Sequence, residues 1–142
     1  MPKRNGSTFI IIKPDNTVLM QLRDENCKRF PNMWCFPGGV VDKNETPLEA
    51  TVREAKEEYN LNIDKKDCTL LIKYQAPYDD NLMEYTYLCP LKGDQKPIMR
   101  EGADMEWMDI DKIKSIKIGF GQDLVVNKLD NYLNEIQQTC QG

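Results

Sequence analysis

Three glutamates in the segment 53–58 are spaced for metal chemistry. A helix advances about 100° per residue, so Glu54, Glu57 and Glu58 would share one face within an arc of about 100°. Like charges at this spacing destabilise an isolated helix by roughly a few tenths of a kcal/mol each. Carboxylate oxygens suit Mg²⁺ or Mn²⁺, and we therefore predict that these side chains bind a divalent metal ion. The alternative is an acidic helix face that is merely solvated.

The helix that carries the glutamates has recognisable ends. The run Thr46-Pro47-Leu48-Glu49 is a capping box with proline at the first helical position, which predicts a helix start at Pro47. Asn60 is typical of the left-handed turn that ends a helix. Opposite the glutamates we expect an apolar stripe that faces the core, formed by Leu48, Val52, Ala55 and Tyr59.

Two adjacent glycines precede this helix, in the segment Trp34–Gly39. Because glycine has no Cβ, its backbone can approach a ligand closely. The carbonyl group of Gly39 is therefore a fourth candidate ligand for the metal ion.

These residues together resemble the Nudix hydrolase signature, G-x5-E-x7-R-E-U-x-E-E-x-G-U, in which U is aliphatic. The matching residues are Gly39, Glu45, Arg53, Glu54, Ala55, Glu57, Glu58 and Leu61. Two positions depart from the pattern: Asn60 replaces a glycine, and Ala55 is a small occupant of an aliphatic position. Neither departure removes a charged residue.

The resemblance to MutT-like Nudix hydrolases implies Mg²⁺-dependent hydrolysis of the pyrophosphate linkage of a nucleoside diphosphate derivative. It assigns Glu54, Glu57, Glu58 and the Gly39 carbonyl to the metal ion, and catalytic roles to Arg53, Glu54 and Glu57. Arg53 is also expected to pair with Glu45 and to orient the loop against the helix. Related enzymes often carry a catalytic glutamate in the loop where Glu101 lies, although Glu101 can equally be an exposed loop acid.

Candidate substrate-binding residues lie outside the signature. Six residues are predicted to contact the nucleotide: Gln21, Arg23, Phe36, Tyr78, Gln122 and Asp123. Gln21 and Arg23 occupy a strand where relatives place phosphate or base contacts. Aromatic rings such as those of Phe36 and Tyr78 can stack on a base. Core packing for Phe36 and helix capping for Asp123 are the alternatives.

The substrate is less sharply defined than the reaction. The leading hypothesis is a nucleoside triphosphate, oxidised or not, cleaved to a monophosphate and pyrophosphate. Pro77 and Tyr78 stand at offsets found in ADP-ribose-cleaving and dinucleoside-polyphosphate-cleaving relatives, so a nucleoside-diphosphate-sugar, ADP-ribose or dinucleoside polyphosphate hydrolase is the alternative. A non-catalytic nucleotide-binding Nudix module is disfavoured, because such modules generally lose signature glutamates.

Composition narrows the class of protein further. The 142 residues predict one Nudix domain, 1–142, and the net charge of −4 argues for a small nucleotide rather than a nucleic-acid polymer as partner. No apolar run approaches the ~18 residues of a membrane span. Five cysteines, never spaced C-x-x-C, indicate free thiols in a reducing cytoplasm. With no histidine, acid–base chemistry would fall to carboxylates, lysine or tyrosine. A monomer or homodimer is expected.

The order of elements predicts a mixed sheet between helical layers, and the resemblance to Nudix hydrolases implies the α/β/α sandwich of that family, an α+β fold. Strands are expected at Ser7–Lys13, Thr17–Arg23, Val40-Val41, Thr69–Gln75, Leu82–Leu91 and Met105–Ile110. The signature helix is followed by a short turn at Asp109–Lys114 and by an amphipathic C-terminal helix at Leu124–Gln137.

Overall fold

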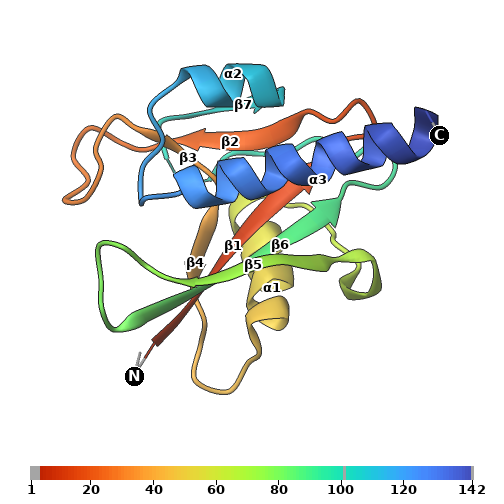
Figure 1. Cartoon of the computed structure of the whole chain (residues 1–142). Coiled ribbons are helices and arrows are strands. Elements are labelled where there is room, and N and C mark those ends of the chain that lie inside the picture. Colours follow the sequence, from red (N-terminus) through yellow and green to blue (C-terminus); the bar gives the residue numbers. More distant parts are fainter. Residues whose placement is uncertain (1–3, 101, 142) are drawn as a thin grey trace.

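A seven-stranded mixed sheet forms the centre of the computed structural model, which describes residues 4–100 and 102–141, with side chains to residue 138 (Figure 1). Its main path runs β3-β2-β1-β6-β5, with β4 paired to β1 and β7 paired to β2. The strands are β1 (Arg4–Ile12), β2 (Val18–Leu22), β3 (Trp34–Cys35), β4 (Gly38–Val40), β5 (Thr69–Gln75), β6 (Leu82–Pro90) and β7 (Asp104–Met108). Pairing of β1 with β6 is parallel, whereas the other named pairs are antiparallel.

Helices cover both faces of the sheet, which confirms the predicted α/β/α arrangement. The helical elements are α1 (Pro47–Tyr59), the 3-10 turn Lys65–Asp67, α2 (Ile110–Ser115) and α3 (Asp123–Gln141). Ile10 and Ile12 of β1 belong to the apolar cluster under α3. Phe9 and Ile11 belong to the cluster under α1. The alternation of side chains along one strand thus supplies both halves of the core.

The ends of α1 agree with the sequence prediction. The Thr46 side chain accepts a hydrogen bond from the Glu49 backbone N–H, and the Glu49 side chain accepts one from the Thr46 backbone N–H. At the other end, Asn60 adopts a left-handed conformation, with a φ of 55°. Its backbone N–H donates to the carbonyl groups of Ala55 and Lys56. Both ends of the helix are therefore fixed by local hydrogen bonds.

The predicted division of α1 into an apolar face and an acidic face is only partly correct. Ala55 and Tyr59 are fully buried, but Leu48 and Val52 are only half-buried. Glu54, which was expected on the solvated side, is 8% exposed. The helix is rotated so that Glu54 lies against β4, where a glycine leaves room for its carboxylate.

Strand boundaries near the glycines also differ from the prediction. The sequence predicted a strand at Val40-Val41, whereas β4 already begins at Gly38 and the short β3 precedes it. A Cβ atom on Gly38 would lie 2.4 Å from the carbonyl oxygen of Ser7 in β1. Glycine is required here because the two backbones pack against each other without space for a side chain.

The remaining elements lie close to their predicted positions. The expected turn after β7 is the helix α2, whose N-cap is Asp109, and its side chain accepts a hydrogen bond from the Lys112 backbone N–H. α3 begins at Asp123 and is longer than predicted. The four described cysteines are free thiols, as expected. In the part of the chain that the structure describes, no helix is both long and apolar enough to cross a membrane.

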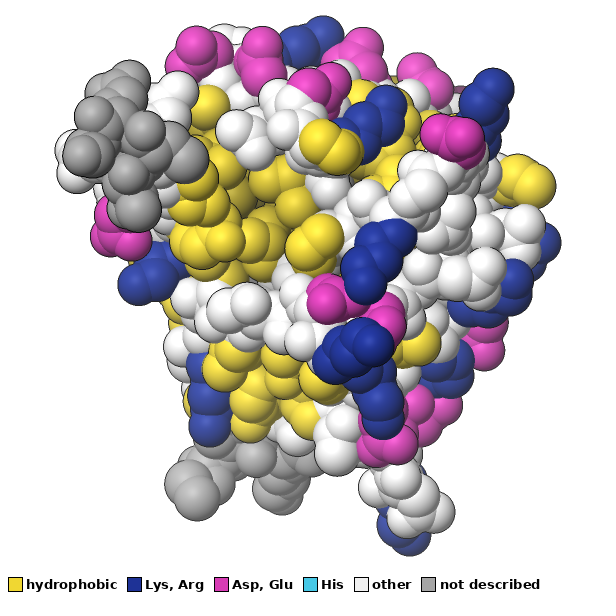
Figure 2. Space-filling view, turned by 90° about the vertical axis from the view of Figure 1, so that its right-hand side faces the viewer, with side chains coloured by type: hydrophobic (Ala, Val, Ile, Leu, Met, Phe, Trp, Pro, Cys, Tyr) yellow, Lys and Arg dark blue, Asp and Glu magenta, His cyan; other side chains and the backbone are white. Residues whose placement is uncertain are grey.

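An apolar groove lies at the opposite end of the sheet from the residues discussed below. It lies between α3 and the ends of β1 and β6, and is lined by residues that include Ile12, Leu88, Leu91, Leu133 and Ile136. Figure 2 shows apolar side chains gathered on this face. The expectation of a monomer or homodimer stays a prediction.

Tyr59→Phe is expected to lower the free energy of unfolding by about 1–3 kcal/mol, because it leaves a buried acceptor without its donor. The Tyr59 hydroxyl donates to the side-chain oxygen of Gln21, and both residues are buried. The edge-to-face contact with Phe9 is kept in the variant. Urea unfolding provides the measurement, with Tyr132→Phe, a half-buried tyrosine on α3, as the control. Equal stability of the two variants would contradict the expectation.

Candidate active site

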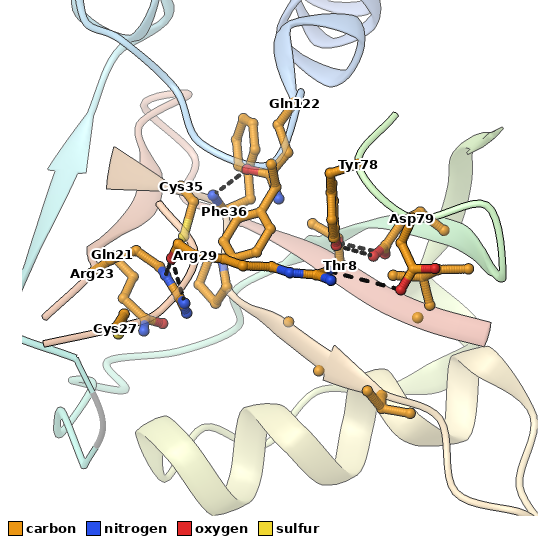
Figure 3. Close-up of a pocket in the computed structure, with 18 of the residues that line it drawn as sticks. Thr8, Gln21, Arg23, Cys27, Arg29, Cys35, Phe36, Tyr78, Asp79 and Gln122 are labelled. Carbon is orange, nitrogen blue, oxygen red and sulfur yellow. Dashed lines mark hydrogen bonds and ion pairs between the residues drawn. The ribbon is translucent and has the colours of Figure 1, made fainter. Parts of the chain in front are cut away.

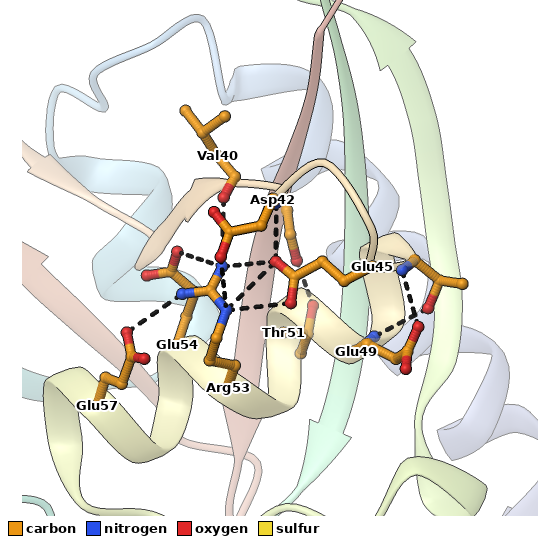
Figure 4. A network of polar contacts seen from close by, with 10 residues as sticks. Val40, Asp42, Glu45, Glu49, Thr51, Arg53, Glu54 and Glu57 are labelled. Carbon is orange, nitrogen blue, oxygen red and sulfur yellow. Dashed lines mark hydrogen bonds and ion pairs between the residues drawn. The ribbon is translucent and has the colours of Figure 1, made fainter.

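Arg53 organises the acidic residues around the start of α1 (Figure 4). Its guanidinium group contacts both Glu45 carboxylate oxygens, with Nε at 3.2 and 3.1 Å and Nη2 at 2.6 Å from Oε1. This contact confirms the predicted Arg53–Glu45 pair. The hydrogen bonds from Arg53 hold the pKa of Glu45 below its usual range. Arg53 also donates to the carbonyl oxygen of Val40 at 3.4 Å, so it ties the loop after β4 to the helix.

The same guanidinium group reaches two of the three glutamates in the segment 53–58. Arg53 Nη2 lies 3.3 Å from Glu54 Oε1, and Arg53 Nη1 lies 3.1 Å from Glu57 Oε2. Repulsion between these carboxylates is therefore offset by a cation of the protein itself. The repulsion between Glu54 and Glu57 therefore does not by itself require a metal ion, because Arg53 already supplies a positive charge.

The carboxylates nevertheless suit a hard divalent cation. No group of three acidic or cysteine side chains forms a ready-made metal cage within residues 4–100 and 102–138. Mg²⁺ usually keeps several water ligands and needs only one or two protein carboxylates. Glu57 is 60% exposed and open to such waters, whereas Glu54 is held in place.

Gly39 and Glu54 form a close contact between β4 and α1. A Cβ atom on Gly39 would lie 2.3 Å from Glu54 Oε1, so the carboxylate fills the space that a side chain would need. The buried Glu54 carboxylate and the backbone carbonyl group of Gly39 both offer oxygen ligands of the kind that Mg²⁺ prefers. The residues present therefore fit the metal ion that the sequence predicted.

The loop before β7 is hydrogen-bonded to the C-terminal half of α1. The Arg100 backbone N–H donates to the carbonyl oxygen of Glu58 at 3.1 Å, and its Nη1 donates to the carbonyl oxygen of Glu57 at 3.1 Å. The predicted catalytic residue Glu101 lies outside the described residues.

A pocket of about 580 Å³ opens beside Gly39 and is drawn in Figure 3. Five of the six predicted substrate-binding residues line it: Gln21, Arg23, Phe36, Tyr78 and Gln122. The sixth, Asp123, is exposed at the first position of α3 and is not among the lining residues. The pocket also reaches Gly38 and Gly39, so it shares one wall with the acidic helix.

Aromatic rings and cations lie together in this pocket. Tyr78 and Phe120 pack at a centroid distance of 5.4 Å, and Phe30 packs against both rings. The Arg23 guanidinium lies 4.7 Å from the centroid of Phe120, and that of Arg29 lies 5.2 Å from the centroid of Tyr78. Rings and guanidinium groups in this arrangement provide surfaces for a base and for phosphates.

Two of the predicted substrate-binding residues, Phe36 and Gln21, also stabilise the fold. Phe36 is 2% exposed and belongs to the core under α3, which is the alternative that its sequence position allowed. Its backbone N–H donates to Gln122 Oε1 at 2.9 Å. Gln21 accepts a hydrogen bond from Tyr59 and thereby links β2 to α1. Only part of each of these side chains is left for a ligand.

Sequence reasoning missed Glu84, which the structure places in the wall of the pocket. Parallel pairing of β1 with β6 brings Glu84 beside Gly6 and Thr8. Burial raises the pKa of Glu84 above its usual range. The only local signal was one acidic residue in the otherwise uncharged strand 82–90.

The fold and the signature residues on α1 together define a class of hydrolase that cleaves pyrophosphate linkages. The NUDIX domain model matches residues 2–129, and the chain belongs to the Nudix family. It is a Nudix hydrolase that acts on nucleotide derivatives. Members of this family generally use a divalent metal ion such as Mg²⁺.

Individual relatives differ in their named substrates. An RNA pyrophosphohydrolase from Pelagibacter ubique (strain HTCC1062) is 30% identical over 139 residues, covering 84% of this chain and 85% of the relative. An 8-oxo-dGTP diphosphatase from Escherichia coli (strain K12) is 28% identical over 100 residues, covering 70% of this chain and 76% of the relative. A solved structure from work on MutT of Aliivibrio salmonicida and Vibrio cholerae matches with a TM-score of 0.75 and 23% identity, covering 89% of this chain and 95% of that chain. This last likeness confirms the fold.

Proposed function

We propose that this chain hydrolyses nucleoside triphosphates, oxidised or not, to a nucleoside monophosphate and pyrophosphate. The observation that carries the proposal is the common wall of the pocket and the acidic helix, formed at Gly39. A base between the aromatic rings would direct its phosphates toward Glu54 and Glu57. The volume of about 580 Å³ lies within the range of about 300–1,000 Å³ of small-ligand sites.

The metal ion in this proposal is Mg²⁺, with Mn²⁺ as a substitute. Glu54, Glu57, Glu58 and the Gly39 carbonyl would hold it. When bound, it would supply counter-charge for the phosphoryl oxygens and lower the pKa of a bound water. Arg53 would keep both carboxylates in position, because it forms an ion pair with Glu54 and a hydrogen-bonded ion pair with Glu57. Glu101 is proposed as a further catalytic carboxylate.

Arg23 and Arg29 are proposed to bind phosphate, because both guanidinium groups lie beside aromatic rings of the pocket. Phe36, Tyr78, Gln21 and Gln122 are proposed to surround the base, and Asp123 to contribute from the start of α3. The whole chain, 1–142, would act as a single cytoplasmic domain on a small-molecule nucleotide rather than on a nucleic-acid polymer.

The test is a comparison of kcat/KM with Mg²⁺ over a panel of substrates. The panel comprises the common nucleoside triphosphates and their 8-oxo forms, ADP-ribose, nucleotide sugars and diadenosine polyphosphates. An RNA with a 5′ triphosphate is added because the Pelagibacter relative is named an RNA pyrophosphohydrolase. We expect a triphosphate to give the highest value, with pyrophosphate rather than phosphate as product.

Glu57→Gln protein, purified in the same way, controls for contaminating phosphatases. A higher kcat/KM for ADP-ribose, a nucleotide sugar or a diadenosine polyphosphate would replace the proposed substrate class with that one. A higher value for the RNA end would show that the pocket serves the terminal nucleotide of a polymer. Tight binding of nucleotide without any product would identify a non-catalytic module.

A further inference from the structure

Glu84 places a carboxylate in the pocket at a position prepared for it by the neighbouring strand. In the parallel ladder, Glu84 of β6 pairs with Gly6 of β1. A Cβ atom on Gly6 would lie 2.6 Å from Glu84 Oε1. The carboxylate therefore fills the space above Gly6, and a larger residue at position 6 would displace it.

The hydrogen bonds of Glu84 come from two neutral hydroxyl groups. Thr8 Oγ1 donates to Oε2 at 3.1 Å, and the Tyr78 hydroxyl donates to Oε1 at 3.4 Å. Burial and the nearby Glu84 carboxylate raise the pKa of Tyr78 to about 12, so its hydroxyl remains a donor at neutral pH. A carboxylate has about four lone-pair sites, and two donors leave half of them for a ligand.

None of the lysine and arginine side chains that the structure describes neutralises this carboxylate. Among the described residues, no lysine or arginine nitrogen lies within ion-pair distance of Glu84, although four basic residues line the same pocket. Arg4 and Arg29 instead both pair with Asp79, and Figure 3 shows Arg29 extended toward it. A half-buried carboxylate without a cation is costly, so a ligand that donates hydrogen bonds would relieve that cost.

The neighbouring groups suggest what such a ligand is. Tyr78 provides an aromatic face beside the carboxylate. The side-chain oxygen of Gln122 is occupied by the Phe36 backbone N–H, which leaves its amide N–H groups to donate to a carbonyl group. The pocket thus combines an acceptor pair, a stacking face and an amide donor.

We propose that Glu84 is a specificity-determining residue that accepts hydrogen bonds from N1–H and the exocyclic 2-amino group of a guanine-type base. This proposal rests on the proposed function and names its substrate class. Guanine and 8-oxoguanine present two adjacent N–H donors on one edge, whereas adenine presents an acceptor beside a single amino group. Hypoxanthine keeps N1–H but lacks the 2-amino group.

The test measures binding, so that it does not depend on turnover. Dissociation constants for the α,β-methylene analogues of GTP, ITP and ATP are measured by calorimetry with Mg²⁺, for the wild-type protein and for Glu84→Gln. In the wild-type protein the GTP analogue is expected to bind about tenfold more tightly than the ITP analogue, as for other paired base contacts. In the variant this ratio is expected to fall to about twofold or less, because the amide presents a donor to the 2-amino group.

Affinity for the ATP analogue is expected to change little in Glu84→Gln. Glu106→Gln, a strand glutamate that pairs with Lys112 at 2.7 Å outside the pocket, is the matched control and is expected to keep the wild-type ratio. Burial raises the pKa of Glu84, so keeping this carboxylate ionised in the folded protein lowers stability at pH values above the usual pKa of a glutamate. We therefore expect the melting temperature of Glu84→Gln at pH 7 to be no lower than that of the wild type.

Three results would overturn the proposal. They are an unchanged GTP/ITP ratio in Glu84→Gln, an equal loss of affinity for all three analogues, and tighter wild-type binding of the ATP analogue. An equal loss would assign Glu84 to the sugar or to the structure of the pocket. A protein that binds the GTP analogue with the expected ratio but cleaves no triphosphate would contradict the proposed function and leave the role of Glu84 intact.

Discussion

Glu57→Gln is expected to reduce kcat by more than about 100-fold, because replacing even an indirect partner of a metal ligand typically costs about 10–100-fold. The change keeps the shape of the side chain and removes its charge. Glu57 is 60% exposed, and it forms an ion pair with Arg53, one turn earlier on α1. An exposed pair at this spacing contributes only about 0.3–0.5 kcal/mol. We therefore expect the loss of activity to occur without a comparable loss of stability.

Steady-state kinetics and thermal unfolding of the same protein samples provide the measurement. Binding of Mn²⁺, followed by electron paramagnetic resonance, supplies a second readout and is expected to weaken in Glu57→Gln. Lys56→Gln, an exposed neighbour on the same helix, is the control and is expected to retain wild-type activity and Mn²⁺ binding. Full activity of Glu57→Gln would remove this residue from the catalytic group.

Gly39→Ala is expected to lower kcat/KM by about 100-fold, the cost typical of moving a catalytic group by about 1 Å. The new Cβ atom would lie 2.3 Å from Glu54 Oε1. That oxygen belongs to a side chain, so the carboxylate can move away at a modest cost in stability. Its displacement from the wall shared by the pocket and α1 is the cause of the expected loss.

Gly38→Ala provides the matched comparison. Its Cβ atom would lie 2.4 Å from the Ser7 carbonyl oxygen and 2.9 Å from Thr8 Cα, both in the backbone of β1. Overpacking of this kind costs about 1–3 kcal/mol, and here the neighbouring atoms cannot rotate away. Urea unfolding should show the larger destabilisation for Gly38→Ala and only a small one for Gly39→Ala. The reverse order would contradict our account of the two glycines.

Features set by neighbouring residues could be predicted from the sequence. The limits of α1 follow from the capping box at Thr46 and the turn at Asn60, since both act within one helical turn. The strand predicted at Thr69–Gln75 is the strand observed. The Nudix signature also predicted that Gly39 and Glu54 lie close together, because its spacing reflects a contact between a strand and a helix.

Features set by distant residues could not be predicted in this way. The burial of Glu54 depends on the missing side chain of Gly39, which periodicity along α1 alone does not report. Glu84 enters the pocket only because β6 pairs in parallel with β1, a choice that no local pattern in either strand determines. The two-residue strand β3 is defined by its pairing with β2 rather than by its own composition.

The central position of β1 has a consequence for how the chain acquires its structure. β1 precedes the other described strands, yet its parallel partner β6 comes only after β5 in the chain. The α1 helix can cover Phe9 and Ile11 early, but Ile10 and Ile12 on the other side of β1 stay uncovered during synthesis until α3 has left the ribosome. Pairing two segments so far apart in the chain costs loop-closure entropy before their contacts stabilise the fold, and this cost slows folding. This half of the core therefore forms late in synthesis. A chaperone that shields Ile10 and Ile12 of β1 could act until α3 packs against them.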